Sequence, residues 1–425
     1  MPQAVNWYAM AAERGLPSAE FKYGLCLEEG VAVAQDRAQA AMWYQRAAEH
    51  GCAHAAYKLG LIYAQGCPNV PQDHVLAARY FLMAAEQDLP GAQFELGACL
   101  AAGRGMPRND AQAAQWYHRS AEQHYAQAQE SLGRCYEEAV GLPKDLAQAA
   151  HWYERAADQD LPSAMFALAC LYEKGTTDRP QAIRLYQRAA AAGHAPAQHA
   201  LGVHMRDGVG VPRDPAGAVG LFELAAAQGH AAAQYALSAC YRNGTGVDQD
   251  TAQEVAWCQR AAEAGDATAQ FTLGWWHETG SHVHQDHRQA VEWYLRAASQ
   301  GHHISQYNLA KCYMEGKGVV ASPRQAVEWY HRAADQGYAA AAYNLGLCYA
   351  AGEGVEQNHE LSREWYHRAG RAGCDLALYN LGVIYDNGTG VPRDPDRAMG
   401  FYLQASDQGL DVAIARLRVL QQQQQ

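Results

Sequence analysis

The chain has 425 residues, of which 49% are hydrophobic, and its formal net charge is −12 at pH 7. This composition can supply a large apolar core, yet no stretch approaches the roughly 18 consecutive apolar residues that a membrane-spanning helix needs. An acidic surface repels phosphates, so the charge argues against nucleic acid and suits a basic partner segment. The first ten residues lack a basic stretch followed by an apolar run, so we expect no signal peptide in this sequence.

A pattern with a period of 36 residues organises the chain. A small residue opens each unit, and successive openings are 36 residues apart except for one spacing of 37 and one of 33. These residues are Ala19, Ala55, Ala92, Ala128, Ala164, Ala197, Ala233, Ala269, Ser305, Ala341, Ala377 and Ala413. Self-similarity at a fixed period indicates a repeat array and overrides a domain count based on length. The pattern therefore predicts a single linear array over 1–425.

The predicted array begins and ends in mid-unit. Residues 4–15 match only the second half of a unit, and eleven complete units follow over 16–409. Residues 410–420 match a first half alone, and 421–425 form a glutamine tail. We expect 410–420 to cap the array.

The first half of each unit predicts a helix with one apolar face. Ala55, Leu59 and Tyr63 are spaced by four residues, which places them on one side of a helix, and Gly60 lets a second helix approach closely. A glycine-rich turn such as 208–214 then ends the helix, because glycine tolerates a positive φ and proline resists helix continuation.

The second half predicts a helix that carries alanine, then Trp-Tyr, then two alanines, as in 290–298 and 326–334. The aromatic side chains should fill the space between hairpins. An arginine lies in the last turn of this helix, where a cation suits the negative end of the helix dipole. These arginines are Arg46, Arg155, Arg260, Arg296, Arg332 and Arg368.

This combination of motifs resembles the Sel1-like repeat family, which is related to the tetratricopeptide repeats. The matching residues recur over 4–420. The resemblance implies an all-α fold, a right-handed superhelical solenoid of antiparallel helix pairs whose first helices line a concave groove. It also implies a protein-binding function that depends on the choice of partner. Stacking by itself predicts that each hairpin contacts only its neighbours.

Residues 161–229 are the least regular stretch. The turn at 175–180 is three residues shorter than in other units, and Leu185 and Leu221 replace the usual tryptophan. Two interpretations stay open. One is neutral variation, and the other is a change of superhelical pitch or a weak joint.

Signatures of catalysis are absent from the sequence. It has no Gly-x-x-x-x-Gly-Lys-Ser/Thr loop, no Gly-x-Ser-x-Gly elbow and no His-Glu-x-x-His helix. Some relatives in the Sel1-like family have been labelled β-lactamases, but no Ser-x-x-Lys motif occurs here. We therefore expect no catalytic residues and no cofactor.

The densest group of possible metal ligands is His282, His284 and His287, with Asp286 beside them. A His-x-His spacing suits zinc or copper if the loop folds back. Because nothing fixes a fourth ligand, we favour an exposed polar loop without a metal.

Seven of the eleven cysteines fall at or beside one position of the first helix, as expected for a small buried hydrophobe. They are Cys26, Cys99, Cys135, Cys170, Cys240, Cys312 and Cys348. Disulfide-stapled members of the family carry a matched cysteine in each second helix, and here only Cys258 lies in one. We therefore expect free thiols and a cytoplasmic location, whereas a signal peptide upstream of Met1 would favour export.

Three successive units carry Tyr-Asn-Leu in the first helix, and these supply the candidate binding residues. They are Tyr307, Asn308, Tyr343, Asn344, Tyr379 and Asn380. The leucine belongs to the core, so the asparagine before it should project toward the concave face. In tetratricopeptide repeats, an asparagine before Leu-Gly contacts the main chain of bound peptides. That match is direct for Asn344 and Asn380 and weaker for Asn308, and an asparagine ladder between helices is the alternative.

Trp275 and Trp276 are larger than the residues at their positions in other units, so we expect one to pack and the other to face the groove. Trp275 is the candidate apolar anchor. The sequence as a whole predicts a monomeric adaptor or scaffold that binds a protein or an extended peptide with basic residues near its ends. An Ala-rich, Lys-poor composition is compatible with a bacterial source, and an exported factor that acts on a host or the envelope is the alternative.

Overall fold

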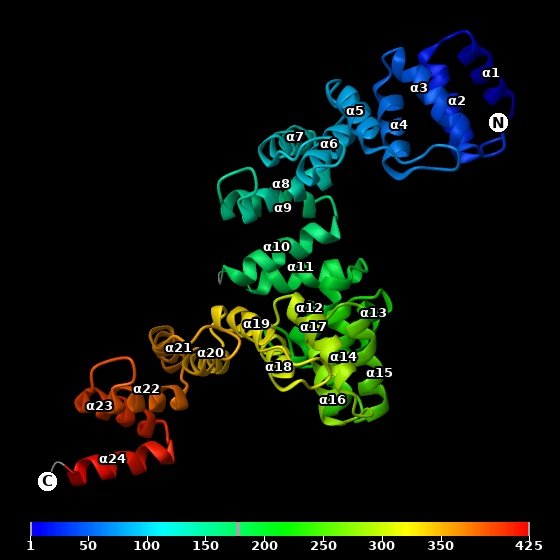
Figure 1. Ribbon diagram of the computed structural model, residues 1–425. Helices are drawn as coiled ribbons and strands as arrows, with labels where there is room; N and C mark the ends of the chain where they lie inside the picture. Colours follow the sequence, from blue (N-terminus) through cyan, green and yellow to red (C-terminus); the bar gives the residue numbers. More distant parts are fainter. Residues whose placement is uncertain (1, 176–178, 424–425) are drawn as a thin grey trace. The chain divides into compact units, whose positions relative to one another are not determined.

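A computed structural model describes residues 2–175 and 179–423 (Figure 1). Within these residues the chain forms 24 α-helices and no strand, which confirms the predicted all-α fold. The contacts divide the chain into two compact units, 1–201 and 202–425. The shortened turn at 175–180 lies partly outside the described residues.

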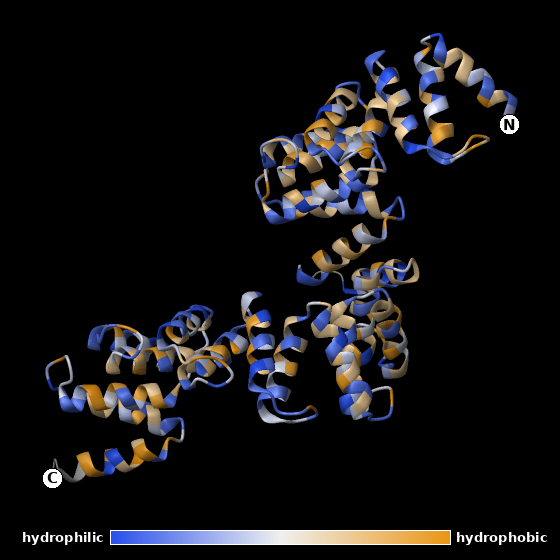
Figure 2. Ribbon diagram, turned by 45° about the vertical axis from the view of Figure 1, so that its right-hand side comes forward, coloured by the Kyte–Doolittle hydropathy of each residue, from blue (hydrophilic) through white to orange (hydrophobic). Residues whose placement is uncertain are grey.

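The helices are α1 (Pro2–Glu13), α2 (Pro17–Glu29), α3 (Arg37–Glu49), α4 (Ala53–Gln65), α5 (His74–Ala85), α6 (Pro90–Ala102), α7 (Asp110–Glu122), α8 (Ala126–Glu138), α9 (Leu146–Ala157), α10 (Pro162–Lys174), α11 (Arg179–Ala191), α12 (Ala195–Asp207), α13 (Pro215–Ala227), α14 (Ala231–Asn243), α15 (Thr251–Glu263), α16 (Ala267–Thr279), α17 (His287–Ser299), α18 (His303–Glu315), α19 (Pro323–Asp335), α20 (Ala339–Ala351), α21 (His359–Arg371), α22 (Asp375–Asn387), α23 (Pro395–Asp407) and α24 (Asp411–Gln423). Even-numbered helices are the first helices of hairpins and odd-numbered helices are the second. Figure 2 shows apolar and polar residues mixed along the helices. No helix in 2–175 or 179–423 is both long and apolar enough to cross a membrane.

In most hairpins an aromatic ring of the second helix lies against a glycine of the first helix, 20 or 21 residues earlier. A Cβ on Gly60 would lie 2.6 Å from the Phe81 ring, and a Cβ on Gly346 would lie 2.4 Å from the Tyr366 ring. Only a hydrogen atom leaves room for the ring at this distance. The same pairing joins Gly24 to Tyr44, Gly97 to Tyr117, Gly133 to Tyr153, Gly202 to Phe222, Gly274 to Tyr294 and Gly382 to Tyr402.

A buried glutamine links successive hairpins, and the sequence analysis missed it. Gln129 Nε2 donates to the Ala121 carbonyl at the end of the preceding helix (3.1 Å), and its Oε1 accepts from Gln159 at the end of its own hairpin (2.8 Å). The same pairs are Gln93 with Gln123, Gln270 with Gln300 and Gln306 with Gln336. This glutamine relay satisfies polar groups that water does not reach.

The arginines in the last turn of the second helix lie over an indole ring three residues earlier. The Arg332 guanidinium is 4.3 Å from the centre of the Trp329 ring, and Arg46 is 4.7 Å from Trp43. The same contact pairs Arg119 with Trp116, Arg155 with Trp152, Arg260 with Trp257, Arg296 with Trp293 and Arg368 with Trp365. For all of these arginines except Arg119, the helix dipole was the only role predicted from the sequence, but a cation–π contact also holds them.

The eleven cysteines are unpaired in the structure. Cys135, Cys240, Cys312 and Cys348 are buried in first helices, as predicted. The other three first-helix cysteines, Cys26, Cys99 and Cys170, are half-buried, so the expectation that the whole set is buried was wrong. Position in the repeat sets the direction of the thiol, but neighbouring side chains decide how well it is covered.

Candidate functional site

The three predicted asparagines occupy the same turn of α18, α20 and α22, and each is half-buried. Each amide hydrogen-bonds to a tyrosine of the helix before it. The pairs are Asn308 with Tyr294, Asn344 with Tyr330, and Asn380 with Tyr366, and Asn380 also contacts Tyr343. Burial raises the pKa of the Tyr330 hydroxyl, and the hydrogen bond from Asn344 opposes that shift. The amides are thus held in one orientation by tyrosines.

The neighbouring tyrosines, Tyr307, Tyr343 and Tyr379, are half-buried as well. Each ring packs against the second-helix tyrosine of its own hairpin, with centroids 5.8, 5.9 and 5.4 Å apart, respectively. The contact with the second-helix tyrosine therefore explains why each ring is partly buried. Their role in partner binding stays a prediction.

The two tryptophans of α16 point in different directions. Trp276 is 1% exposed and belongs to the core, whereas Trp275 is 44% exposed. Leu347, at the position of Trp275 two hairpins later, is 41% exposed, and Leu376 on α22 is 43% exposed. These exposed side chains supply apolar contact area on the first helices α16, α20 and α22. We call the surface of α16, α18, α20 and α22 the first-helix face.

A cavity of about 440 Å³ opens beside Trp275. Its walls include Tyr235, Phe271, Trp275 and Trp276, and its polar side holds Arg242, Glu254 and His282. The Arg242 Nε donates to Glu254 Oε1 at 2.6 Å. His282 Nε2 lies 3.6 Å from the other carboxylate oxygen, and the histidine ring stacks on Trp276 with centroids 4.8 Å apart.

The three histidines of the 281–290 loop are not brought together. His282 faces Glu254 and Trp276, as described above. His284 offers its main-chain carbonyl to His277 Nδ1 at 3.3 Å, and His287 begins α17. In 2–175 and 179–423, no three His, Cys, Asp or Glu side chains gather in a way that could hold a metal ion.

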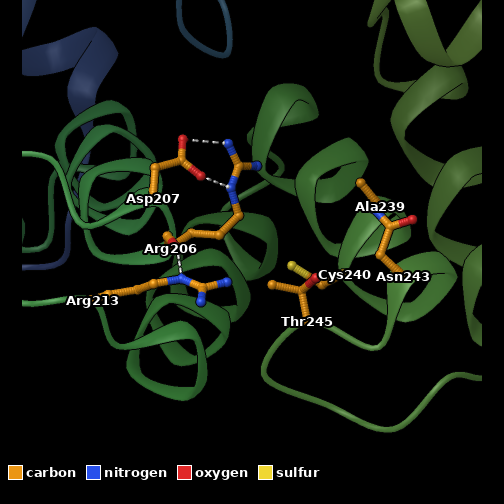
Figure 3. A pocket seen from close by; sticks show the side chains of 7 residues that line it. All are labelled: Arg206, Asp207, Arg213, Ala239, Cys240, Asn243 and Thr245. Atoms are coloured by element: carbon orange, nitrogen blue, oxygen red, sulfur yellow. Dashed lines mark hydrogen bonds and ion pairs between the residues drawn. The ribbon is translucent and has the colours of Figure 1, made fainter.

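A smaller pocket of about 210 Å³ lies where α12 and its turn meet α14 (Figure 3). The Arg206 guanidinium donates twice to Asp207, at 2.7 and 2.9 Å, and Arg213 Nε donates to the Arg206 carbonyl at 3.1 Å. Asn243 and Thr245 complete the opposite wall. Because Asp207 offsets the charge of Arg206, we do not assign an anion site here. None of these residues was predicted from the sequence to form a site.

The Sel1 repeat model matches the chain in twelve consecutive segments, 1–16, 17–52, 53–89, 90–125, 126–161, 162–194, 195–230, 231–266, 267–302, 303–338, 339–374 and 375–410. The chain belongs to the Sel1 repeat family. Sel1 repeat proteins are generally non-catalytic scaffolds that bind other proteins, so a protein-interaction role follows for this chain at that level. Most matched segments begin at a first helix and end just before the next one, as the hairpin boundaries do.

The chain is also similar to solved structures of Sel1 repeat proteins. The crystal structure of a protective antigen present in uropathogenic Escherichia coli strains, which displays the same fold, is 30% identical to this chain. The match covers 99% of this chain and 90% of the antigen with a TM-score of 0.59. A Sel1 repeat protein from Oxalobacter formigenes is 29% identical over 81% of this chain and 89% of its own, with a TM-score of 0.42. No curated protein matches the chain.

Proposed function

We propose that this Sel1 repeat protein is a monomeric cytoplasmic scaffold that holds an extended segment of a partner protein along its first-helix face. Asn308, Asn344 and Asn380 would contact the main chain of that segment. One observation carries the proposal, namely that three half-buried amides recur at the same turn of α18, α20 and α22. An amide has two donor and two acceptor positions, so a hydrogen bond to a tyrosine uses only part of its capacity.

The chemistry of the surrounding surface supports an extended ligand. Amides at a regular spacing suit a main chain that runs across successive helices, because main-chain groups also recur regularly. Trp275, Leu347 and Leu376 supply apolar contacts beside them. The net charge of −12 favours a segment with lysine or arginine near its ends. Fixed asparagine orientations also reduce the entropy lost on binding.

The test begins with identification of the partner by affinity capture and mass spectrometry from the source cell. Calorimetric titration then compares the protein with a variant in which Asn308, Asn344 and Asn380 are alanine. Each lost hydrogen bond should cost about 1 kcal/mol, so the triple variant should bind roughly 100-fold more weakly. Its stability should change less than its affinity, because Tyr294 retains its hydrogen bond to Glu278 and Tyr366 retains its hydrogen bond to Ser362.

A matched control lies on the second helices. Gln253, Gln289 and Gln325 are exposed, recur with the same 36-residue period and occupy one position of α15, α17 and α19. Their replacement by alanine should leave affinity unchanged. Unchanged affinity in a folded asparagine variant would reject the proposal. Weaker binding in the glutamine variant would then place the partner on the second helices.

A second candidate is an exported factor that acts on a host or on the bacterial envelope. The similarity to a protective antigen of uropathogenic Escherichia coli favours this alternative. The eleven unpaired cysteines favour the cytoplasm. Cell fractionation with an antibody against the chain separates the two, since an exported protein would appear in the periplasm, the envelope or the medium.

A further inference from the structure

The hairpin of α14 and α15 departs from the repeat at several positions, and two of the departures, Glu254 and His282, line the cavity beside Trp275. At the position of Glu254, the other ten hairpins carry alanine nine times and Ser362 once. At the position of Cys258, all ten carry tyrosine or phenylalanine. His282, in the next turn, occupies a site that is glycine in most turns, and it adopts a φ of +67°.

These departures remove a ring at one position and add a charged pair at another, because Cys258 stands in place of the ring and Glu254 in place of alanine. Glu254 is only 4% exposed at its side chain, an unusual burial for a carboxylate, and it is bonded to Arg242. Ser238 stands where most hairpins have the glycine that contacts the ring, and its hydroxyl donates to the Glu254 carbonyl at 2.9 Å. The hairpin has therefore lost its own aromatic ring and acquired a carboxylate.

Other hairpins show what such a carboxylate binds. Where a first helix carries glutamate near its end, the second-helix tyrosine donates its hydroxyl to it. The distances are 2.7 Å for Tyr44 and Glu28, 3.0 Å for Tyr153 and Glu137, and 2.5 Å for Tyr294 and Glu278. In the α14–α15 hairpin the acidic group is present on the second helix, and the phenol is missing.

The charges around the cavity select a neutral ligand. Arg242 and Glu254 cancel each other, so a cation entering the cavity would meet Arg242, and an anion would meet Glu254. The Glu254 Oε2 lies 3.6 Å from His282 Nε2, which is beyond hydrogen-bond distance, so it has capacity to accept a further donor. The volume of about 440 Å³ is within the range of roughly 300–1,000 Å³ that ligand pockets occupy.

We propose that this cavity receives a tyrosine side chain of the partner, with its ring against Trp275 and Phe271 and its hydroxyl donating to Glu254. The proposal rests on the proposed function, because the tyrosine would belong to the segment held along the first-helix face. Aromatic rings pack favourably edge to face or offset, and Tyr235, Phe271 and Trp275 line the cavity. The partner would thus supply the phenol that donates to a carboxylate in other hairpins and that the α14–α15 hairpin lacks.

The test uses small probes and the full chain, so it does not require the partner. Ligand-observed NMR measures the binding of N-acetyl-tyrosinamide, N-acetyl-phenylalaninamide and N-acetyl-lysinamide. We expect the tyrosine probe to bind about tenfold more tightly than the phenylalanine probe, a difference of about 1.4 kcal/mol from the hydroxyl. Glu254→Ala restores the usual residue of the repeat. It should reduce the affinity for the tyrosine probe to that for the phenylalanine probe.

Two further variants define the site. Trp275→Leu removes one wall of the cavity and introduces the residue that the repeat has at Leu347, so the variant should fold. Its affinity for the tyrosine probe should be at least about fivefold lower. Leu347→Ala, at the matching position two hairpins later, should leave probe binding unchanged. If Glu254→Ala unfolds because Arg242 loses its partner, Trp275→Leu still decides the outcome.

The proposal is overturned if the tyrosine and phenylalanine probes bind equally, if the lysine probe binds best, or if no probe binds at about 10 mM, a concentration well above the millimolar scale of weak binding. The asparagine triple variant separates this inference from the proposed function. This variant should still bind the tyrosine probe, because its substitutions lie on other helices, even if it no longer binds the partner segment.

Discussion

Gln93, Gln129, Gln270 and Gln306 each use one buried amide to join the end of the preceding helix to the end of their own hairpin. The relay is interrupted in the α14–α15 hairpin, where the position thirty residues after Gln234 is Ala264. Among the described residues, Gln234 Oε1 is buried without a hydrogen-bond partner. A buried acceptor in this state costs stability.

Ala264→Gln should therefore stabilise the protein by about 1 kcal/mol, because the new amide can donate to Gln234 Oε1. Ala264 is exposed, so the larger side chain meets no crowded core. Urea denaturation measures the change. Ala264→Met, which adds similar bulk without a donor, is the control, and an equal gain for both variants would contradict the relay.

The cysteine thiols give a second prediction for single residues. Burial raises the pKa of Cys258 to about 12 and that of Cys312 to about 11, so these thiols should react slowly in the folded protein. A colorimetric thiol titration without reductant should count about eleven thiols after denaturation. Two or more native disulfides would overturn the cytoplasmic proposal.

At the scale of helices, the glycine–ring contact sets how closely the two helices of a hairpin approach. Gly346→Ala would place a Cβ 2.4 Å from the Tyr366 ring, so we expect a loss of about 1–3 kcal/mol in the free energy of unfolding. Gly400 on α23 has no atom within 4 Å of the same added Cβ. Gly400→Ala should stabilise the protein slightly in the same denaturation experiment, because alanine favours a helix.

Two first helices begin with a histidine that caps their amides. His302 Nδ1 accepts from the Ser305 amide at 3.2 Å, and His230 accepts from Ala233 in the same way. Burial lowers the pKa of His302, His303 acts in the same direction, and Asp266 opposes the shift. The unfolded chain therefore binds the proton more readily than the folded one, and stability should fall as pH drops below about 6.5.

His302→Asn keeps a capping oxygen that does not titrate, as Asn109 and Asn358 already provide for α7 and α21. The urea midpoint of the unchanged protein should decrease between pH 7.5 and pH 5.5, and the decrease should be smaller in His302→Asn. A His302→Ala variant should lose about 1 kcal/mol at both pH values, because it lacks any cap. An identical pH dependence in the parent and the asparagine variant would show that His302 does not contribute.

The sequence predicted helices and hairpins well because their signals are local. Leu59, Gly60 and Tyr63 lie within one turn of each other, and the 36-residue period repeats this signal along the chain. The close approach at the glycine was predicted, but the relay and the ring that contacts each glycine were not, because their partners are 20 to 30 residues apart. The exposure of Trp275 was expected, but its cavity was not, since Glu254 is unusual only when it is aligned with the alanines of other hairpins.

At the scale of the whole molecule, hydrogen exchange tests whether 161–229 is a weak stretch. Leu185 of α11 and Leu221 of α13 replace the tryptophans that pack at this position in α17, α19 and α21. Amides of α11 and α13 should therefore exchange faster than those of α17 and α19. Leu185→Trp should slow exchange in α11 if the missing ring is the cause. Equal protection in all four helices would favour neutral variation.

Every specific link described above joins residues of one hairpin or of two consecutive hairpins. Gln270 donates to the Ala262 carbonyl, and Gln306 donates to the Ala298 carbonyl one unit later. Excision of 267–302 would bring Gln306 against Ala262, so the new junction would contain the same groups as the old one. The number of hairpins can therefore change in whole steps without a new interface having to arise. A surface built on first helices can in this way be lengthened or shortened to the size of its ligand.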